Sequence, residues 1–292
     1  MARVVANRIE IEYESFGSAK APAILLIMGL GAQLIRWNME LCDLLVTRGY
    51  RVIRFDNRDC GLSTHCDQFP RPDLRLLQPG KPLPSLSYSL DDMAADSLGL
   101  LDALGIAQAH IVGASLGGAI AQLIAARHPE RTLSLTSIMS SSGNPALPPP
   151  TPAANLALFA PLPLQRDKES IVADACRRFA ALCSPAYPTE PERLRRLFAA
   201  EYDRAFHPAG IARQLAALIA NGDRRPLLGR ITAPTVVLHG ADDPLIREEC
   251  GRDVAAHVPG AELRIIPGMA HDFAPGLSAT FADAICAAAS RA

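Results

Sequence analysis

Residues 109–118 read AHIVGASLGG, and this short stretch decides how the rest of the chain is interpreted. The apolar run 109–112 is typical of a buried strand, and the apolar pattern over 116–127 is typical of a helix. Ser115 lies between them, inside the pattern Gly-x-Ser-x-Gly. A very sharp strand-to-helix turn leaves a serine hydroxyl exposed, and the glycines around it give the turn the room it needs. The stretch therefore predicts that Ser115 is a nucleophile at the edge of an α/β sheet.

Strand and helix patterns alternate on both sides of this stretch. Period-2 alternation over 9–14 predicts a half-buried edge strand, and a continuous apolar run over 23–28 predicts a strand buried on both faces. Further strands are expected at 50–55, 133–140, 235–239 and 262–266, and helices at 38–47, 90–104, 116–127 and from 278 onward. Ser89 and Asp92 resemble a capping box at the start of the second helix. This rhythm favours an α/β fold with a mostly parallel sheet, right-handed crossovers and helices on both faces.

The alternation stops near Gly143. Five prolines in 144–152 indicate a linker or hinge, because proline blocks both helix continuation and ladder pairing. Residues 153–222 then give only helical patterns, including 170–183, 190–204 and 209–220. We expect one core domain formed by 1–143 and 223–292, and a helical cap insertion over 144–222 positioned above the site.

A serine nucleophile needs a base within hydrogen-bond reach and an acid that orients the base. In this architecture both follow later strands, in the chain order acid and then histidine. Gly240 to Pro244 (GADDP) follows one late strand, and Pro267 to His271 (PGMAH) follows the next. His271 alone among the seven histidines has the required position, so we predict that it is the base. Spacing does not choose between the adjacent carboxylates Asp242 and Asp243.

The negative charge that develops on a substrate oxygen needs two backbone N–H donors. We expect one from Leu116, directly after the nucleophile, and one from Leu30 in the loop Met28 to Gly31. Gly29, Gly31 and Trp37 are candidate pocket residues, although the glycines could simply form a tight turn and Trp37 could equally belong to the core. Residues 56–63 (DNRDCGLS) carry alternating charges, which we interpret as an ion-pair and turn network along the wall of the site.

Composition excludes several other classes of function. The 292 residues have a formal net charge of −1, which gives no field to attract nucleic acid or an anionic membrane. The longest apolar run, 21–30, is too short to span a bilayer, and no signal-peptide pattern is visible, so we expect a cytoplasmic location. Seven scattered cysteines without a C-x-x-C spacing predict neither a metal site nor a disulfide framework. We expect no cofactor, and the sequence does not specify the oligomeric state.

These motifs together resemble the α/β-hydrolase family over nearly the whole chain. The matching stretches are MGLG at 28–31, FDNRDCGLST at 55–64, GASLGG at 113–118, HGADDP at 239–244 and GMAHDF at 268–273. The chain is most similar to bacterial esterases related to the aclacinomycin methylesterases, which remove a methyl ester from a polyketide. The resemblance implies that the acid is Asp243, directly before Pro244. Two positions depart from the wider family, which has His-Gly where this chain has Met28-Gly29 and often Met where it has Leu116.

We therefore expect a serine carboxylic-ester hydrolase that acts through an acyl-enzyme. Its partner would be a small-molecule ester, of small to medium size and either hydrophobic or a methyl ester. A lactonase, a perhydrolase, an acyltransferase or a C–C bond hydrolase with the same three residues stays open as an alternative. A non-catalytic ligand-binding relative usually lacks one of the three, and all three are present here.

Overall fold

A computed structural model describes residues 2–76, 78, 81, 86–160 and 162–292 of the protein. Within these ranges the strands form one eight-stranded sheet with the order β1-β2-β4-β3-β5-β6-β7-β8. The strands are β1 (Ala2–Ala6), β2 (Ile9–Phe16), β3 (Ala23–Ile27), β4 (Arg51–Phe55), β5 (Ala109–Ala114), β6 (Thr132–Ile138), β7 (Thr235–Gly240) and β8 (Glu262–Ile266). In the part of this order that runs β4-β3-β5-β6-β7-β8, all neighbouring strands are parallel, which confirms the predicted fold class.

The prediction that residues 9–14 form an edge strand was wrong. β2 is antiparallel to β4 on one side, and β1 pairs with its other side in a register that places Val4 opposite Ile11. Alternation along a strand shows that one face is buried, but it does not show how many neighbours the strand has. The short segment ARVVA at 2–6 carries too little pattern of its own to reveal β1.

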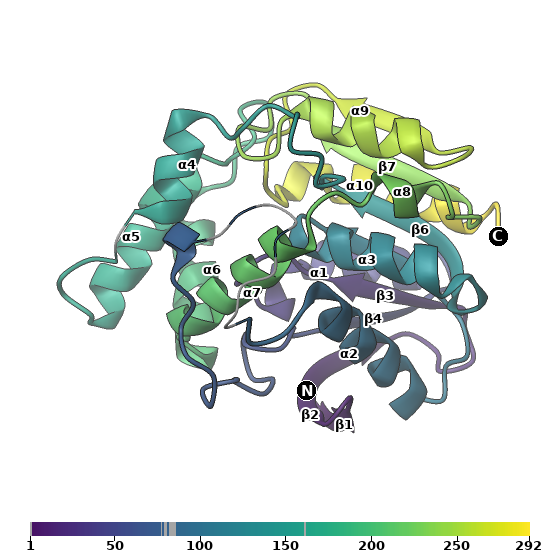
Figure 1. Ribbon diagram of the computed structural model, residues 1–292, viewed down its shortest axis with the longest axis horizontal. Coiled ribbons are helices and arrows are strands. Elements are labelled where there is room, and N and C mark those ends of the chain that lie inside the picture. Colours follow the sequence, from purple (N-terminus) through teal and green to yellow (C-terminus); the bar gives the residue numbers. More distant parts are fainter. Residues whose placement is uncertain (1, 77, 79–80, 82–85, 161) are drawn as a thin grey trace.

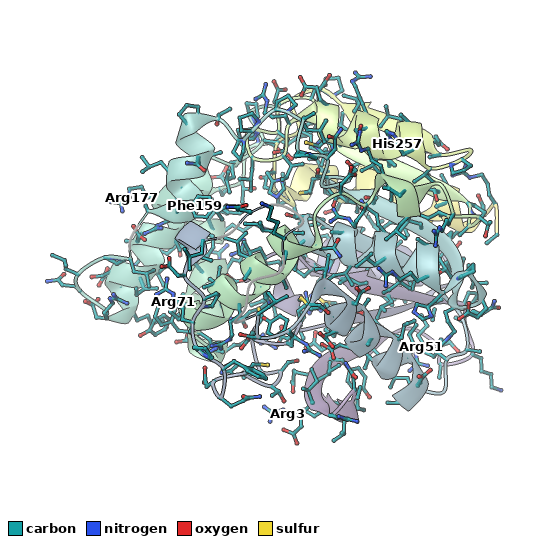
Figure 2. The ribbon with its side chains drawn as sticks, viewed as in Figure 1. Arg3, Arg51, Arg71, Phe159, Arg177 and His257 are labelled. Atoms are coloured by element: carbon teal, nitrogen blue, oxygen red, sulfur yellow. The ribbon has the colours of Figure 1, made fainter. Side chains whose placement is uncertain are left out.

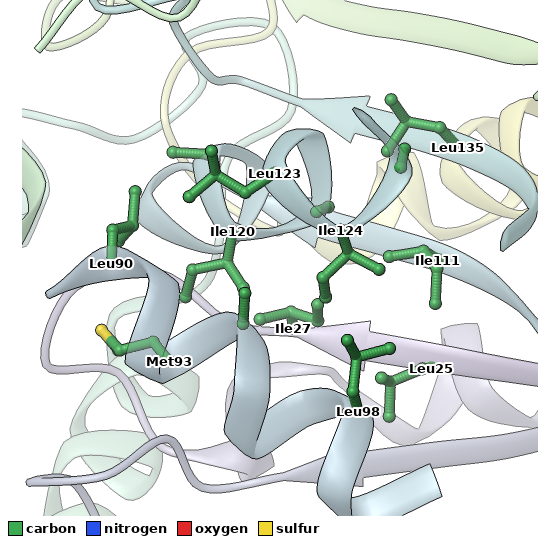
Figure 3. Close-up of a cluster of buried hydrophobic side chains, with 14 of the residues drawn as sticks. Leu25, Ile27, Leu90, Met93, Leu98, Ile111, Ile120, Leu123, Ile124 and Leu135 are labelled. Atoms are coloured by element: carbon green, nitrogen blue, oxygen red, sulfur yellow. The ribbon is translucent and has the colours of Figure 1, made fainter. Parts of the chain in front are cut away.

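Helices cover both faces of the sheet (Figure 1). On one face, α2 (Leu90–Ala103), α3 (Leu116–Arg127), α8 (Arg225–Leu228) and α9 (Glu248–His257) pack over an apolar cluster that includes Leu25, Ile111 and Ile120. Figure 3 shows side chains of α2 and α3 meeting those of β3 and β5 in this cluster. On the other face, α1 (Met39–Thr47) and α10 (Ser278–Ala289) pack over a second cluster. Single turns of 3₁₀ helix lie at Leu34–Arg36, Leu74–Leu76, Pro129–Arg131 and Pro275–Leu277.

Local signals located several helix ends correctly. α3 has the predicted bounds, and the capping box at α2 is present, because Ser89 and Asp92 each accept a hydrogen bond from the other's backbone N–H. α4 (Pro152–Phe159) lies almost wholly within the stretch 153–222 that was predicted to be helical, whereas α8 and α9 were not predicted. Pro152, taken as part of a linker, instead occupies the first turn of α4, where the missing N–H of proline costs nothing.

Residues 144–222, called the helical segment below, lie between β6 and β7. They contain α4, α5 (Lys168–Ala180), α6 (Pro191–Arg204) and α7 (Pro208–Asn221), which gather beyond one end of the sheet (Figure 1). Hydrogen bonds join this segment to the loops after β3, β4, β7 and β8, as between Thr151 and Pro244. The segment therefore lies over the carboxyl ends of the strands.

Charged side chains spread over the outside of the molecule. The labelled Arg3, Arg51 and Arg177 lie at separate edges in Figure 2. In the described part of the chain, no helix is both long and apolar enough to cross a membrane.

Candidate active site

Ser115 occupies a strained turn between β5 and α3. Its φ of 56° and ψ of −119° lie in a region that a residue with a side chain rarely adopts. A Cβ at Gly113 would lie 2.0 Å from the Gly117 carbonyl oxygen, and a Cβ at Gly117 would lie 2.0 Å from the Ile27 carbonyl oxygen. Only glycine fits at these two positions. The turn leaves Ser115 partly exposed at the N-terminus of α3, where the helix dipole favours negative charge.

The loops after β7 and β8 bring an acid and a histidine to Ser115. His271 Nε2 lies 3.2 Å from Ser115 Oγ, and His271 Nδ1 lies 2.7 Å from Asp243 Oδ2. The second carboxylate oxygen, Asp243 Oδ1, accepts the N–H groups of Leu245 and Ile246 at 2.9 Å each. These bonds fix the carboxylate, so one of its oxygens faces the imidazole. A continuous hydrogen-bonded chain thus runs from the Asp243 carboxylate to the Ser115 hydroxyl.

The neighbouring Asp242 does not take part in this chain. Its side chain is exposed, and its Oδ2 accepts the N–H of Gly268 at 2.8 Å. Asp243, in contrast, is 1% exposed. The imidazole of His271 is thus bonded to Asp243 and not to Asp242.

His239 is a second buried histidine close to Asp243. Its Nε2 lies 2.7 Å from the Ile246 carbonyl oxygen and 3.7 Å from Asp243 Oδ2. Burial lowers the pKa of His239, which favours a neutral ring. A neutral imidazole that donates to a backbone carbonyl packs against the acid without competing for its charge.

The loop 28–31 lies directly against the nucleophile. A Cβ at Gly29 would be 3.1 Å from Ser115 Cβ, so the loop backbone and the serine are in contact. The N–H of Gly31 donates to Gln214 Oε1 of α7 at 2.8 Å and is therefore occupied. The N–H groups of Leu30 and Leu116 have no acceptor among the residues that the structure describes. Two unoccupied donors next to a serine are what a developing oxyanion requires.

Trp37 is completely buried, and the structure favours its core role. Its ring centroid lies 4.6 Å from that of Phe273, which follows His271 by two residues in the chain. Trp37 thus packs beneath the loop that carries the histidine.

Residues 56–63 form the predicted network of ion pairs and turns, and this network reaches further than the sequence indicated. Asp56 accepts the Leu34 and Leu62 N–H groups and pairs with Arg204 of α6 at 3.0 Å. Asp59 pairs with Arg213 of α7 through contacts of 2.7 and 2.8 Å. Further bridges in this region join Arg58 to Asp96 and Arg36 to Glu201.

Burial affects the two central carboxylates of this network differently. Burial raises the pKa of Asp56, and the hydrogen bonds and charge of its partners do not fully offset it. For Asp59, burial acts in the same direction, but hydrogen bonds from Arg213 and the Cys66 N–H outweigh it and lower the pKa. Asp59 is therefore the more firmly ionised of the two. Arg204 and Arg213 lie more than a hundred residues away in the chain, so no local signal could have predicted these pairs.

One cluster has the side chains of a metal site but is already occupied by a cation. His65, Asp67 and His207 offer ligand atoms within 4.8 Å of one another. However, the Arg213 guanidinium lies 2.9 Å from His207 Nε2 and 3.1 Å from Asp67 Oδ1. Its positive charge opposes a bound metal ion, so we assign no metal to this cluster. The seven cysteines are unpaired, and burial raises the pKa of the Cys66 thiol to about 11.

The fold and this arrangement of residues define an α/β hydrolase. The chain belongs to the alpha/beta hydrolase fold family, whose model matches residues 22–274.

Comparison with individual proteins is consistent with this assignment. Rhodomycin D methylesterase DnrP from Streptomyces peucetius is 28% identical, over 98% of this chain and 97% of its own length. 3-Oxoadipate enol-lactonase 2 from Acinetobacter baylyi is 26% identical, over 90% of this chain and 87% of its own. Among solved structures, CumD, a meta-cleavage product hydrolase from Pseudomonas fluorescens, superposes with a TM-score of 0.77 at 18% identity, over 100% of this chain and 98% of its own, which speaks for the fold alone. The predicted resemblance to bacterial methylesterases is confirmed.

Proposed function

We propose that this protein is a serine carboxylic-ester hydrolase in which Ser115 is the nucleophile, His271 the general base and Asp243 the orienting acid. The observation that carries the proposal is the chain of hydrogen bonds from Asp243 through His271 to Ser115 Oγ. A serine hydroxyl is a weak nucleophile by itself, and an imidazole within reach activates it by accepting its proton.

The reaction would proceed through an acyl-enzyme. Ser115 Oγ attacks the ester carbonyl carbon while its proton passes to His271 Nε2, and the N–H groups of Leu30 and Leu116 stabilise the oxyanion. The intermediate collapses, the C–O bond to the alcohol breaks, and the alcohol takes the proton from His271. Water then attacks the acyl-enzyme with His271 as base, which releases the acid and restores the serine.

The helical segment supports a preference for apolar or methyl esters and acts in this proposal as a cap. Ile211 of α7 lies against Gly31, beside the proposed oxyanion donors, and is 39% exposed. Exposed apolar side chains continue on the same segment at Leu156, Phe159 and Leu164. The similarity to rhodomycin D methylesterase DnrP, over 98% of this chain, also supports a methyl ester as substrate.

A second candidate is lactone hydrolysis, which uses the same groups on a cyclic ester. The enol-lactonase relative favours it. A panel of p-nitrophenyl esters, methyl esters and lactones separates the two, since activity on lactones alone would replace the general-esterase proposal.

The nucleophile is tested by Ser115→Ala with p-nitrophenyl butyrate as substrate. We expect the variant to lose about 10⁴-fold or more in kcat. Wild-type turnover in the variant would show that another group attacks the ester.

Because all seven cysteines are free, we also propose a cytoplasmic location, which fractionation of the native host would test.

A further inference from the structure

The helical segment holds the loop that carries His271 through hydrogen bonds to its backbone. The His271 N–H donates to the Leu182 carbonyl oxygen at 3.0 Å, and the N–H of the preceding residue, Ala270, donates to Ser184 Oγ at 2.8 Å. Leu182 and Ser184 follow α5, far from the sheet in sequence. The backbone on the N-terminal side of the histidine is thus bonded to the segment that lies over the strands.

The backbone approach continues at the start of the same loop. The Ala186 N–H donates to the Gly268 carbonyl oxygen at 3.3 Å. Gly268 has a φ of +73°, and a Cβ there would lie 2.2 Å from the Ala186 Cβ. The backbone at Gly268 and the residue Ala186 therefore lie so close together that no side chain fits at Gly268.

Ser184 also bonds to the residue that follows the histidine. Its hydroxyl donates to Asp272 Oδ1, and its N–H donates to the same oxygen at 3.2 Å. Ser184 and Asp272 are 2% and 3% exposed. The Ser184 hydroxyl thus accepts from Ala270 and donates to Asp272, so a single oxygen ties together the neighbours of His271 on both sides.

The second carboxylate oxygen of Asp272 shows how much this side chain depends on its bonds with Ser184. Asp272 Oδ2 is buried without a hydrogen-bond partner among the described residues. Ser184 therefore supplies the hydrogen bonds given to this carboxyl, and its removal would leave a buried polar group unsatisfied. The loop would then be expected to shift so that Asp272 could reach another donor or water.

We propose that Ser184 and Asp272 are positioning residues that hold the His271 imidazole at hydrogen-bond distance from Ser115. The helical segment is then part of the scaffold of the base as well as a cover for the substrate. This inference rests on the proposed function, in which His271 is the base. Small displacements matter here, because a misplacement of about 1 Å in catalytic geometry can cost about a hundred-fold in rate.

The test compares Ser184→Ala with a matched control, Ser142→Ala. The Ser142 hydroxyl is also fully buried and donates to a carboxylate, that of Asp253 in α9, which is not part of the His271 loop. Each substitution removes the serine's bond to a carboxylate and one bond that its hydroxyl accepts from a backbone N–H, that of Ala270 at Ser184 and that of Asn144 at Ser142. Each should therefore lower the melting temperature. We expect Ser184→Ala to lower kcat on p-nitrophenyl butyrate by about ten-fold or more with KM within about two-fold, and Ser142→Ala to change kcat by less than about two-fold.

Asp272 provides the second arm of the test. Asp272→Ala should lower kcat as Ser184→Ala does. The double variant should have a kcat no lower than that of the more impaired single variant, because the effects of substitutions within one hydrogen-bond network are not additive. Asp272→Asn keeps an oxygen that accepts from Ser184, so it should retain clearly more activity than Asp272→Ala. The rate at which diethyl p-nitrophenyl phosphate inactivates Ser115 should fall in parallel with kcat.

The inference is overturned if Ser184→Ala keeps the wild-type kcat and inactivation rate while its melting temperature falls as in Ser142→Ala. It is also overturned for Asp272 if the Asn variant is as impaired as the Ala variant. If Ser184→Ala does not fold, the comparison of Asp272→Asn with Asp272→Ala decides. A wild-type protein without activity, or an active Ser115→Ala variant, would instead refute the proposed function.

Discussion

The sheet core and the helical segment are stabilised in different ways. In α3 every residue except Arg127 is buried. Most of its side chains belong to the apolar cluster between α3 and the sheet, the cluster that includes Leu25 and Ile111. In α6, of the same order of length, only Phe198 and Glu201 are buried. Apolar packing holds the core together, and α7 of the segment joins it through Ala217, whereas α6 contacts the core loops through ion pairs.

These polar contacts concentrate on the loops around the site. Arg204, Arg213 and Glu201 of the segment pair with Asp56, Asp59 and Arg36 of the core loops. A buried ion pair contributes little net free energy of folding, but breaking it by removing one partner is costly. Such contacts therefore determine where the segment sits more than how stable the chain is. The candidate site residues thus lie on the core, while paired charges and the packing of α7 together position the segment.

The largest expected effect concerns the acid on the core side. Asp243→Asn should lower kcat by about 10⁴-fold, because the amide would hold the imidazole in the wrong tautomer. Asp242→Asn should stay within about ten-fold of wild type, since the Asp242 side chain is exposed and within the described chain bonds only to the Gly268 N–H. Steady-state kinetics on one ester measures both, and a larger loss at Asp242 would reverse the assignment of the acid.

The second effect concerns the attachment of the helical segment. Arg213→Met should destabilise the protein by about 3–5 kcal/mol, because it leaves the Asp59 carboxylate buried without its cation. Urea unfolding followed by circular dichroism measures this difference. A loss below about 1 kcal/mol would mean that the pair does not hold α7 to the core.

The same pair predicts a pH dependence of stability. The folded-state pKa of Asp59 is lowered, so its contribution to stability is present above the unfolded pKa of about 4 and is lost as the pH falls through the folded value. Arg213→Met removes the hydrogen bonds and the charge of Arg213 while burial remains, so the pKa of Asp59 in the variant lies above its wild-type value. The difference in unfolding free energy between wild type and variant should therefore narrow from pH 7 to pH 4. A constant difference would argue that Arg213 acts through packing alone.

The smallest effects compare apolar contacts in the two regions. Ile124 of α3 is fully buried, and Ile124→Val should cost about 0.5–1.5 kcal/mol of unfolding free energy. Ile211 of α7 is 39% exposed, and Ile211→Val should stay within about 0.5 kcal/mol of wild type. Equal losses in urea unfolding at both positions would contradict the difference in packing between core and segment.

The parts of the fold that depend on local pattern could be predicted from the sequence. The α3 helix, the capping box at Ser89 and the buried strands follow from periodicity and from turn residues. The edge position of residues 9–14 was wrong because β1 pairs through its backbone and its side chains show little pattern. In the site, Ser115 and His271 came from their positions after strands. Asp243 required the family resemblance.

The links between the core and the helical segment could not be predicted. Ser184 bonds to a loop 88 residues away, and Arg213 pairs with a carboxylate 154 residues away. Serine and arginine on an amphipathic helix or in a loop have many ordinary roles, and nothing in their neighbours specifies a partner. Only the folded arrangement shows which carboxylate each one meets.

The most direct test of the central claim is covalent labelling of Ser115. Wild-type protein is treated with diethyl p-nitrophenyl phosphate, digested, and analysed by mass spectrometry. We expect one diethylphosphoryl group on the peptide that contains Ser115, a label that the Ser115→Ala variant lacks and that His271→Ala acquires much more slowly. A label on another residue, or a wild-type protein that hydrolyses esters while Ser115 stays unmodified, would contradict it.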